Sequence, residues 1–379
     1  MNNHQKKQLV IVINNIDGGT GTYLTQLYQL QNLIPGLTIH TLCLHKPQYR
    51  NIDVLNISFF QADDAQPQKF SLQFTALWRY LRIAWWMHRQ LSSRSPDFII
   101  SIDIYCNIIV ALLHLVSFKN RSKLILTTHI NLKENIKYRA SGFLRSILKS
   151  TVSSLYNVAD KVIAVSSDIT KQHITYFNIK ESKCMTILNG VRIAGNKRRK
   201  RMENRIVSVG RLVPQKDFDT LISAVGLVAK KIPEIELIIY GEGPERASIE
   251  KMAQEKSVAD KVVLKGWSQN VTKEFSHVDL FTFSSNREGF GYVIIEAMSK
   301  GLPVISTDTP YGPAEILCEG KYGILVPMKD AKAMSDAIIS LLTDPEKYSY
   351  FSKQSLKRAA FYSEQAMLQA YYSLLQTTE

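Results

Sequence analysis

The chain has 379 residues, which exceeds the length at which a single hydrophobic core keeps growing, so two domains are expected. Its composition, with 45% hydrophobic and 21% charged residues, is that of a globular protein and excludes a disordered or low-complexity chain. The formal charge of +14 favours partners that carry phosphate, namely a nucleotide, an anionic lipid surface or nucleic acid; solvated surface charge is the alternative.

Apolar runs long enough to cross a bilayer, about 18 residues, do not occur in the sequence, and the run at 9–13 is too short for a signal-peptide core. The four cysteines are scattered: Cys43, Cys106, Cys184 and Cys318. They form no C-x-x-C pair and have no zinc-like spacing, so free thiols in a reducing compartment are expected. The sequence therefore predicts a cytoplasmic protein.

In the first half of the chain, apolar runs alternate with segments of helical period, which predicts a parallel sheet with flanking helices. Strands are expected at 9–13, 38–44, 98–102, 124–128, 161–165 and 185–188. Helices are expected at 22–33, 78–91 and 143–157. A glycine loop that contains Gly18 and Gly19 follows the first strand.

The pattern breaks at 192–205, where a glycine and the basic run 197–201 replace the apolar residues, as is typical of a linker. The alternation then restarts, with strands expected at 206–209, 235–240, 262–264, 280–283 and 304–305. Helices are expected at 219–231, 246–256, 293–300 and 331–342, and a last one at 359–376. We therefore predict an α/β protein of two Rossmann-like domains.

The most informative segment, 284–298, leads from an apolar strand into a helix. Its glycines place backbone N–H groups at the N-terminus of that helix, an arrangement that favours phosphate. Glu288 lies on the loop, at the sheet edge where open α/β sheets bind ligands. Glu296 falls in the opening turns of the helix, where a carboxylate can accept hydrogen bonds from a ribose diol. Two glutamates at this spacing are also common on ordinary surfaces.

The run from Glu288 to Glu296, EGFGYVIIE, resembles the paired-glutamate motif of retaining glycosyltransferase family 4. Other segments match that family's pattern in the same order, at 159–166, 187–191, 209–216, 240–244, 301–308 and 323–327. The resemblance covers nearly the whole chain and is weakest at 50–95. It implies the GT-B fold, in which two Rossmann-like domains face a cleft. The implied domains are 1–192, joined by the C-terminal helix at 359–379, and 193–358.

The resemblance also implies that the second domain holds a nucleotide-sugar donor. Arg211 and Lys216 would hold the diphosphate and stabilise its charge as the sugar leaves. Glu296 would bind the ribose, and Glu288 would contact the sugar and the diphosphate. A surface ion pair is the alternative for the arginine.

Backbone groups and an aromatic side chain would complete the implied donor site: Gly18, Gly19, Gly241, Trp267, Gly289, Phe290 and Gly291. A structural turn is the alternative for the first two glycines, and packing is the alternative for the tryptophan. His129 ends an apolar strand where the family often carries a histidine that faces the sugar. A structural histidine is the alternative there.

The segment Asp217-Phe218-Asp219 is formally an Asp-x-Asp, which binds a metal ion in a different glycosyltransferase fold. Here it begins a helix, where acidic residues are favoured by capping and by the helix dipole. We therefore predict a structural role. Since Arg211 and Lys216 supply the countercharge, no metal and no other cofactor is expected.

The implied reaction is the retaining transfer of a hexose or N-acetylhexosamine, with a UDP-linked donor favoured. The acceptor would be a glycan or lipid-linked glycan in cell-surface polysaccharide or lipopolysaccharide synthesis. It is expected in the first domain, where the basic, aromatic segment 78–89 either touches an anionic membrane surface or is a core-facing helix. The alternatives are a sugar-nucleotide epimerase or another enzyme of this fold, and a nucleic-acid-binding protein, for which no recognised module is present.

Overall fold

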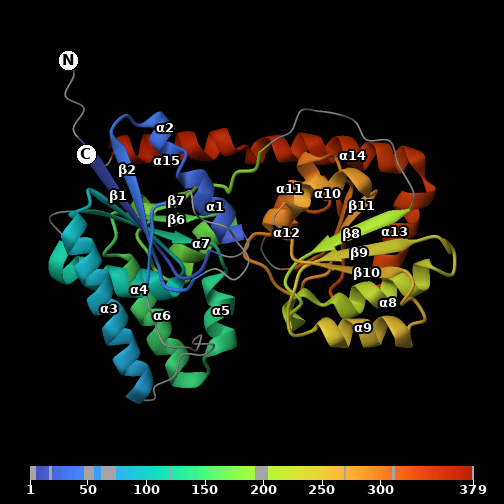
Figure 1. Cartoon of the computed structure of the whole chain (residues 1–379), viewed down its shortest axis with the longest axis horizontal. Helices are drawn as coiled ribbons and strands as arrows, with labels where there is room; N and C mark the ends of the chain where they lie inside the picture. Colours follow the sequence, from blue (N-terminus) through green and yellow to red (C-terminus); the bar gives the residue numbers. More distant parts are fainter. Residues whose placement is uncertain are drawn as a thin grey trace. The chain divides into compact units, whose positions relative to one another are not determined.

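The computed structural model describes residues 6–16, 19–46, 55–60, 74–118, 122–192, 204–268, 270–309 and 312–377. The chain divides into two compact units. Unit 1 comprises Met1–Gly190 and Gln365–Glu379, and unit 2 comprises Val191–Glu364. Each unit is built around one parallel sheet with helices packed on it (Figure 1). The basic run 197–201 and Gly18 lie outside the described residues.

In unit 1, the described strands pair in the order β3-β2-β1-β4-β5-β6-β7. Their bounds are β1 (Lys7–Ile13), β2 (Leu37–Cys43), β3 (Ile57–Phe59), β4 (Phe98–Ile102), β5 (Lys123–Thr128), β6 (Lys161–Ala164) and β7 (Cys184–Thr186). The central strands β1 and β4 are buried on both faces, which explains their continuous apolar sequence. The strand order reverses between these two, and such a point is where open α/β sheets bind ligands.

Helices cover this sheet: α1 (Gly19–Leu27), α2 (Leu30–Leu33), α3 (Phe74–Arg94), α4 (Ile104–Leu113), the π-helical η1 (His114–Phe118), α5 (Leu132–Arg139), α6 (Gly142–Tyr156), α7 (Ser167–Thr175) and η2 (Glu181–Lys183). Ile83, Met87 and Leu91 lie on one face of α3 and belong to the buried core of unit 1. In the described ranges, no helix combines the length and the apolarity that a membrane span requires.

The last helix, α15 (Glu364–Thr377), packs on unit 1, as Figure 1 shows in red along the sheet. Its apolar stripe is buried: Met367, Leu368, Tyr371, Leu374 and Leu375. The hydroxyl of Tyr371 hydrogen-bonds to the hydroxyl of Tyr23 on α1. Because these residues are buried together, the end of the chain is part of the core of unit 1.

In unit 2, the described strands pair in the order β10-β9-β8-β11-β12-β13. They are β8 (Arg205–Val209), β9 (Glu236–Tyr240), β10 (Val262–Gly266), β11 (Leu280–Phe283), β12 (Val304–Thr307) and β13 (Ile324–Val326). The helices are η3 (Pro214–Lys216), α8 (Phe218–Val228), α9 (Arg246–Glu255), α10 (Val271–Glu274), η4 (Phe275–His277), α11 (Tyr292–Ser299), α12 (Pro313–Leu317), α13 (Ala331–Thr343), α14 (Pro345–Ala359) and η5 (Ala360–Tyr362). A second buried core, separate from that of unit 1, lies beneath α8 and α13.

The predicted start of the last helix, at residue 359, is wrong. Ala359 ends α14, the chain makes the short η5 turn, and α15 begins only at Glu364. Between η5 and α15, Ser363 forms an isolated parallel bridge with Val191, which fixes the backbone at this point. The amide of Val191 donates to the carbonyl of Tyr362 (2.7 Å), and the amide of Glu364 donates to the carbonyl of Val191 (3.1 Å). Ser363 is extended, and this interrupts the helix.

Candidate functional site

Two glycines bring the carboxyl ends of β8 and β9 close together in unit 2. The amide of Gly210 donates to the carbonyl of Tyr240 (3.0 Å), and the amide of Gly241 donates to the carbonyl of Gly266 (2.8 Å). Gly241 has φ = 150°, and a Cβ built there would lie 1.9 Å from the carbonyl oxygen of Gly210. Only glycine fits such an approach. The loop that follows β8 is therefore held tightly against the end of β9.

Leu212 anchors this loop. Its side chain is buried, its amide donates to the carbonyl of Glu242 (2.9 Å), and its carbonyl accepts from the amide of Glu245 (3.0 Å). The preceding residue, Arg211, is exposed. A fixed backbone thus presents the predicted phosphate-binding arginine at the surface, at the carboxyl edge of the sheet.

Lys216 and Glu288, both predicted site residues, form an ion pair across the loops that follow β8 and β11. Lys216 Nζ lies 2.6 Å from Glu288 Oε1, and the two side chains are 16% and 12% exposed. The ammonium also lies 4.6 Å from the centroid of the Phe283 ring, a favourable cation–π contact. The structure therefore joins two residues that are 72 positions apart in the sequence.

Three hydrogen bonds tie the two loops together around this pair. Gln215 Nε2 donates to the carbonyl of Arg287 (2.8 Å), and the amide of Asn286 donates to the carbonyl of Gln215 (2.9 Å). Ser284 Oγ donates to the carbonyl of Lys216 (2.8 Å). The sequence analysis assigned no role to Gln215, Ser284 or Phe283. Their partners are distant in sequence, and the only available signal was that they adjoin predicted residues.

The loop then leads into α11, which begins at Tyr292. Gly291 precedes the helix with φ = 92°, a conformation that favours glycine. Phe290 is buried, and its ring lies 5.8 Å from that of Tyr362, so it fixes the loop through packing. In the part of the chain that the structure describes, the amides of residues 289–291 donate no hydrogen bond to another backbone group. These donors and the helix dipole favour an anion.

Two further predicted residues of unit 2, Glu296 and Trp267, lie on α11 and directly after β10. Glu296 is partly exposed in the second turn of α11. Trp267 follows β10 and is exposed, next to Gly266, which has φ = 76°. A Cβ on Gly243, in the loop after β9, would lie 2.3 Å from the carbonyl oxygen of Leu212.

Asp217 lies in the left-handed region, with φ = 47°, and precedes α8. Its carboxylate accepts a hydrogen bond from the side-chain hydroxyl of Thr220 (2.8 Å) but makes no capping hydrogen bond to a described backbone amide of α8. Burial, followed by the charges of Asp217 and Glu245, raises the pKa of Asp219. Among the described residues, no three His, Cys, Asp or Glu side chains are grouped as a metal site. Independence from metal stays a prediction.

Two predicted residues belong to unit 1. Gly19 is exposed and begins α1. His129 follows β5, and its ring lies edge-on to the ring of Tyr23, with 4.3 Å between the centroids. Its Nε2 is buried and has no hydrogen-bond partner among the described residues. Burial lowers the pKa of His129 to about 3, so the ring is neutral at neutral pH.

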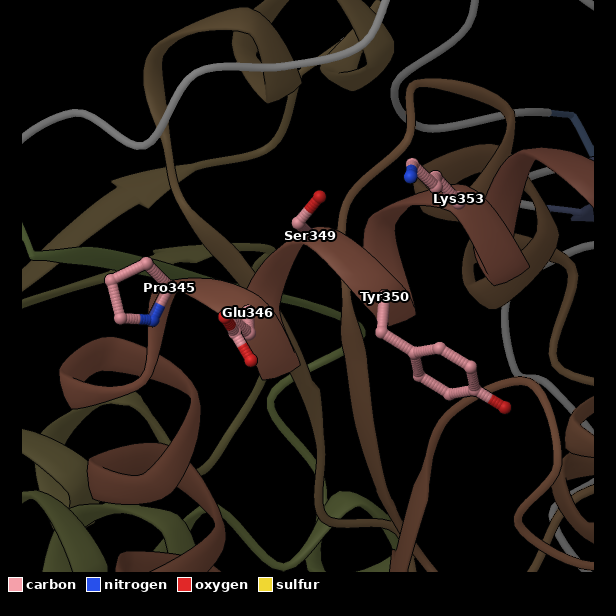
Figure 2. A pocket seen from close by; sticks show the side chains of 5 residues that line it. All are labelled: Pro345, Glu346, Ser349, Tyr350 and Lys353. Carbon is pink, nitrogen blue, oxygen red and sulfur yellow. The ribbon is translucent and has the colours of Figure 1, made fainter.

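The hollow in Figure 2 lies on a different part of unit 2, along α14. It is lined by Pro345, Glu346, Ser349, Tyr350 and Lys353. Figure 2 shows these side chains extending from the helix in different directions, so they do not converge on a common point. None of them is a predicted site residue.

The chain is similar in sequence to curated glycosyltransferases and similar in fold to solved structures. The poly(glycerol-phosphate) alpha-glucosyltransferase of Bacillus subtilis is 34% identical over 159 residues, 42% of this chain and 24% of that protein. The N-acetylgalactosamine-N,N'-diacetylbacillosaminyl-diphospho-undecaprenol 4-alpha-N-acetylgalactosaminyltransferase of Campylobacter jejuni is 27% identical over 251 residues, 64% of this chain and 67% of that protein. Anabaena HepE, solved in complex with UDP, superposes with a TM-score of 0.77 at 16% identity over 98% of this chain and 100% of that one.

The predicted fold class, two Rossmann-like α/β domains of the GT-B type, is confirmed. The chain spans only 24% to 49% of the length of the first curated relatives that it matches. Family models cover most of the chain: Glycosyltransferase Family 4 matches residues 18–194, and Glycosyl transferases group 1 matches residues 192–358. The chain therefore belongs to the glycosyltransferases in which a Family 4 domain is followed by a group 1 domain.

Proposed function

We propose that this chain transfers a hexose or N-acetylhexosamine, with retention of configuration, from a nucleotide sugar to a glycan or lipid-linked glycan. The observation that carries the proposal is the contact between Lys216 and Glu288 beside the N-terminus of α11. A cation, a carboxylate and the amides of residues 289–291, which donate to no other described backbone group, lie on adjoining loops. This combination suits a ligand that carries both phosphate and sugar hydroxyl groups.

In this proposal, Lys216 and Arg211 hold the donor diphosphate together with the amides of residues 289–291. Negative charge grows on the leaving diphosphate while positive charge grows at the sugar carbon, so cations and amide donors fixed near the diphosphate lower the barrier. Because protein groups supply this countercharge, no metal ion and no other cofactor is part of the proposal.

The carboxylates have separate proposed roles. Glu288 accepts hydrogen bonds from hydroxyl groups of the donor sugar, and Glu296, one helical turn into α11, accepts them from the ribose. Trp267 lies against the base, and Gly241 lets the backbone approach the phosphates. In the same proposal, neutral His129 offers a hydrogen bond to the donor sugar, and the backbone amides of Gly18 and Gly19 offer hydrogen bonds to the donor phosphates.

The donor is proposed to be UDP-linked, supported by the UDP in the Anabaena structure. The acceptor is proposed to belong to cell-surface polysaccharide or lipopolysaccharide synthesis. This is supported by the names of the two curated relatives, one of which mentions a poly(glycerol-phosphate) and the other a diphospho-undecaprenol-linked sugar. A cytoplasmic protein in peripheral contact with an anionic membrane fits such an acceptor. Nucleic acid is not a partner in this proposal.

The test measures UDP-sugar binding by calorimetry and the release of UDP when acceptor is added. Lys216→Ala should weaken donor binding. Each of the single variants Lys216→Ala and Glu288→Ala should lower the rate of transfer by about a hundredfold or more, the loss seen when a preorganised charge contact is removed. Lys251→Ala is the matched control, because Lys251 pairs with Glu255 at 3.6 Å on the exposed surface of α9.

Transfer by both site variants at the control rate would contradict the site assignment. Conversion of the donor without any acceptor would indicate an epimerase. Failure of the wild-type protein to bind any sugar nucleotide would overturn the proposed function as a whole.

A further inference from the structure

One face of helix α3 carries large apolar side chains that the rest of unit 1 does not cover. Trp78 is 61% exposed, Leu81 is 53% exposed and Trp85 is 64% exposed. They recur at a spacing of three and four residues, so they form one stripe along the helix. The opposite face is the one that packs into the core. The exposed stripe is therefore additional to the packing of the helix.

Cationic side chains share this stripe. Arg82 and Arg89 are both exposed, and the guanidinium of Arg89 lies 5.7 Å from the centroid of the Trp85 ring. The sequence of α3 contains four arginines and no aspartate or glutamate. We name the five residues on the stripe the outer face of α3: Trp78, Leu81, Arg82, Trp85 and Arg89.

Exposed apolar side chains are concentrated in this part of the molecule. Nine of the fourteen large hydrophobic residues that are exposed in the described ranges lie on α3 and on the helices from α4 to α6. The two most exposed of them are Val116 on η1 and Phe143 on α6, each more than 80% exposed. In Figure 1, α3 and α6 both reach the lower end of unit 1. An ordinary monomer surface scatters such residues singly.

We propose that the outer face of α3 docks unit 1 onto an anionic lipid bilayer. Tryptophan prefers the membrane–water interface because its ring is apolar and its N–H remains hydrated. Arginine can keep its guanidinium at lipid phosphates while its stem lies along apolar groups. The absence of acidic residues from the helix makes its charge complementary to such a surface. A helix of 21 residues, about 31 Å long, lies along the interface instead of crossing it.

This inference rests on the proposed function and deepens it, because an enzyme bound to the bilayer surface lies close to a lipid-linked acceptor. Its test uses no glycosyl transfer, so the two proposals fail separately. Loss of donor binding with intact lipid binding would refute only the function, and the converse would refute only the docking surface.

The experiment is co-sedimentation of the full chain with vesicles. One set is pure phosphatidylcholine, and the other is phosphatidylcholine with about 30% phosphatidylglycerol, which gives the vesicles a negative surface potential. The wild-type protein should bind the second set, and added salt should weaken the binding because it screens exposed charges. The double variant Trp78→Ser/Trp85→Ser should bind at least about tenfold more weakly. Both side chains are mostly exposed, so the variant should keep the wild-type thermal stability.

Two controls separate this surface from general stickiness and general charge. Tyr350→Ser removes an exposed aromatic side chain from unit 2 and should leave lipid binding unchanged. Arg82→Gln/Arg89→Gln should weaken binding to anionic vesicles, whereas Lys230→Gln/Lys231→Gln removes the same charge from exposed positions of unit 2 and should not.

Wild-type binding that the tryptophan variant retains, or no wild-type binding to anionic vesicles, overturns the proposal. Self-association of the wild-type protein that the tryptophan variant abolishes, without lipid binding, would assign the outer face of α3 to a second copy of the chain.

Discussion

The ion pair between Lys216 and Glu288 illustrates what local sequence can and cannot reveal about a site. Both residues were predicted, because each lies in a short motif whose chemistry is readable: a basic residue after a glycine loop, and a carboxylate before a helix. Their contact at 2.6 Å was not predictable, since no pattern specifies which loops converge. The same reason kept Phe283 and Gln215 out of the prediction. Their contribution depends on distant partners.

His129 gives a prediction for the dependence of stability on pH. Burial lowers the pKa of its ring to about 3 in the folded protein, against about 6.5 in an unfolded chain. Between these values the unfolded chain binds a proton that the folded chain does not. Acidification therefore favours unfolding, and stability is lost as pH falls below about 6.5. From pH 8 to pH 5 this residue should remove about 2 kcal/mol from the free energy of unfolding.

Urea unfolding of the wild-type protein and of His129→Asn, each at pH 8 and pH 5, measures this effect. The variant should lose about 2 kcal/mol less on acidification than the wild-type protein. His173, whose pKa burial lowers to about 4, contributes equally to both proteins and cancels in the comparison. His277→Asn, at an exposed position of unit 2, is the control and should lose as much as the wild-type protein. Equal losses for all three proteins would show that the pKa of His129 is not lowered in the folded protein.

At the scale of elements, the approach of Gly210 and Gly241 links fold to site. The substitution Gly241→Ala should destabilise the protein by several kcal/mol, because its Cβ would overlap a backbone oxygen that cannot move without opening the sheet. Gly226→Ala is the matched control. A Cβ at Gly226, on α8, would meet its nearest neighbour at 3.7 Å, an ordinary contact. The free energy of unfolding of Gly226→Ala should rise by about 0.5–1 kcal/mol, because alanine has a higher helix propensity than glycine.

Thermal and urea unfolding of both glycine variants checks this pair of expectations. If Gly241→Ala were as stable as the wild-type protein, the close approach of the β8 and β9 ends would be wrong. The placement of Arg211 and Lys216, which follow the β8 end, would then have to be revised with it.

The elements that were predicted are those with a strong local pattern. The central strands carry apolar runs, and α3 has clear helical periodicity. Elements without such a pattern were missed. α4 is apolar on nearly every side because it is buried, so it has no amphipathic stripe. α7 has the sequence SDITKQHIT, which is mostly polar, and β3 has only three residues. Tertiary packing stabilises these segments, and single-sequence patterns do not record it.

At the scale of the molecule, each unit has its own core, and α15 belongs to unit 1 although it follows unit 2 in the sequence. Leu374 on α15 is buried in unit 1, and Leu341 on α13 is buried in unit 2. Leu374→Ala should destabilise unit 1 by about 2–5 kcal/mol, although residues 191–364 separate it from the rest of that unit. Leu341→Ala should have the same effect on unit 2.

Hydrogen exchange read by mass spectrometry distinguishes the two variants. Leu374→Ala should speed exchange in the strands of unit 1, and Leu341→Ala should speed it in those of unit 2. Faster exchange in unit 2 alone for Leu374→Ala would show that α15 does not belong to the core of unit 1.

The bridge between Val191 and Ser363 closes unit 2 as one uninterrupted stretch of chain inside a discontinuous unit 1. During synthesis, the ribosome delivers residues 191–364 of unit 2 before it delivers residues 365–377 of α15. The rest of unit 1 therefore lacks the buried stripe of α15 until unit 2 has been made, and the apolar side chains that this stripe covers stay exposed in the interval. A chaperone that shields apolar surface on nascent chains should therefore stay bound to unit 1 until residues 365–377 have been added.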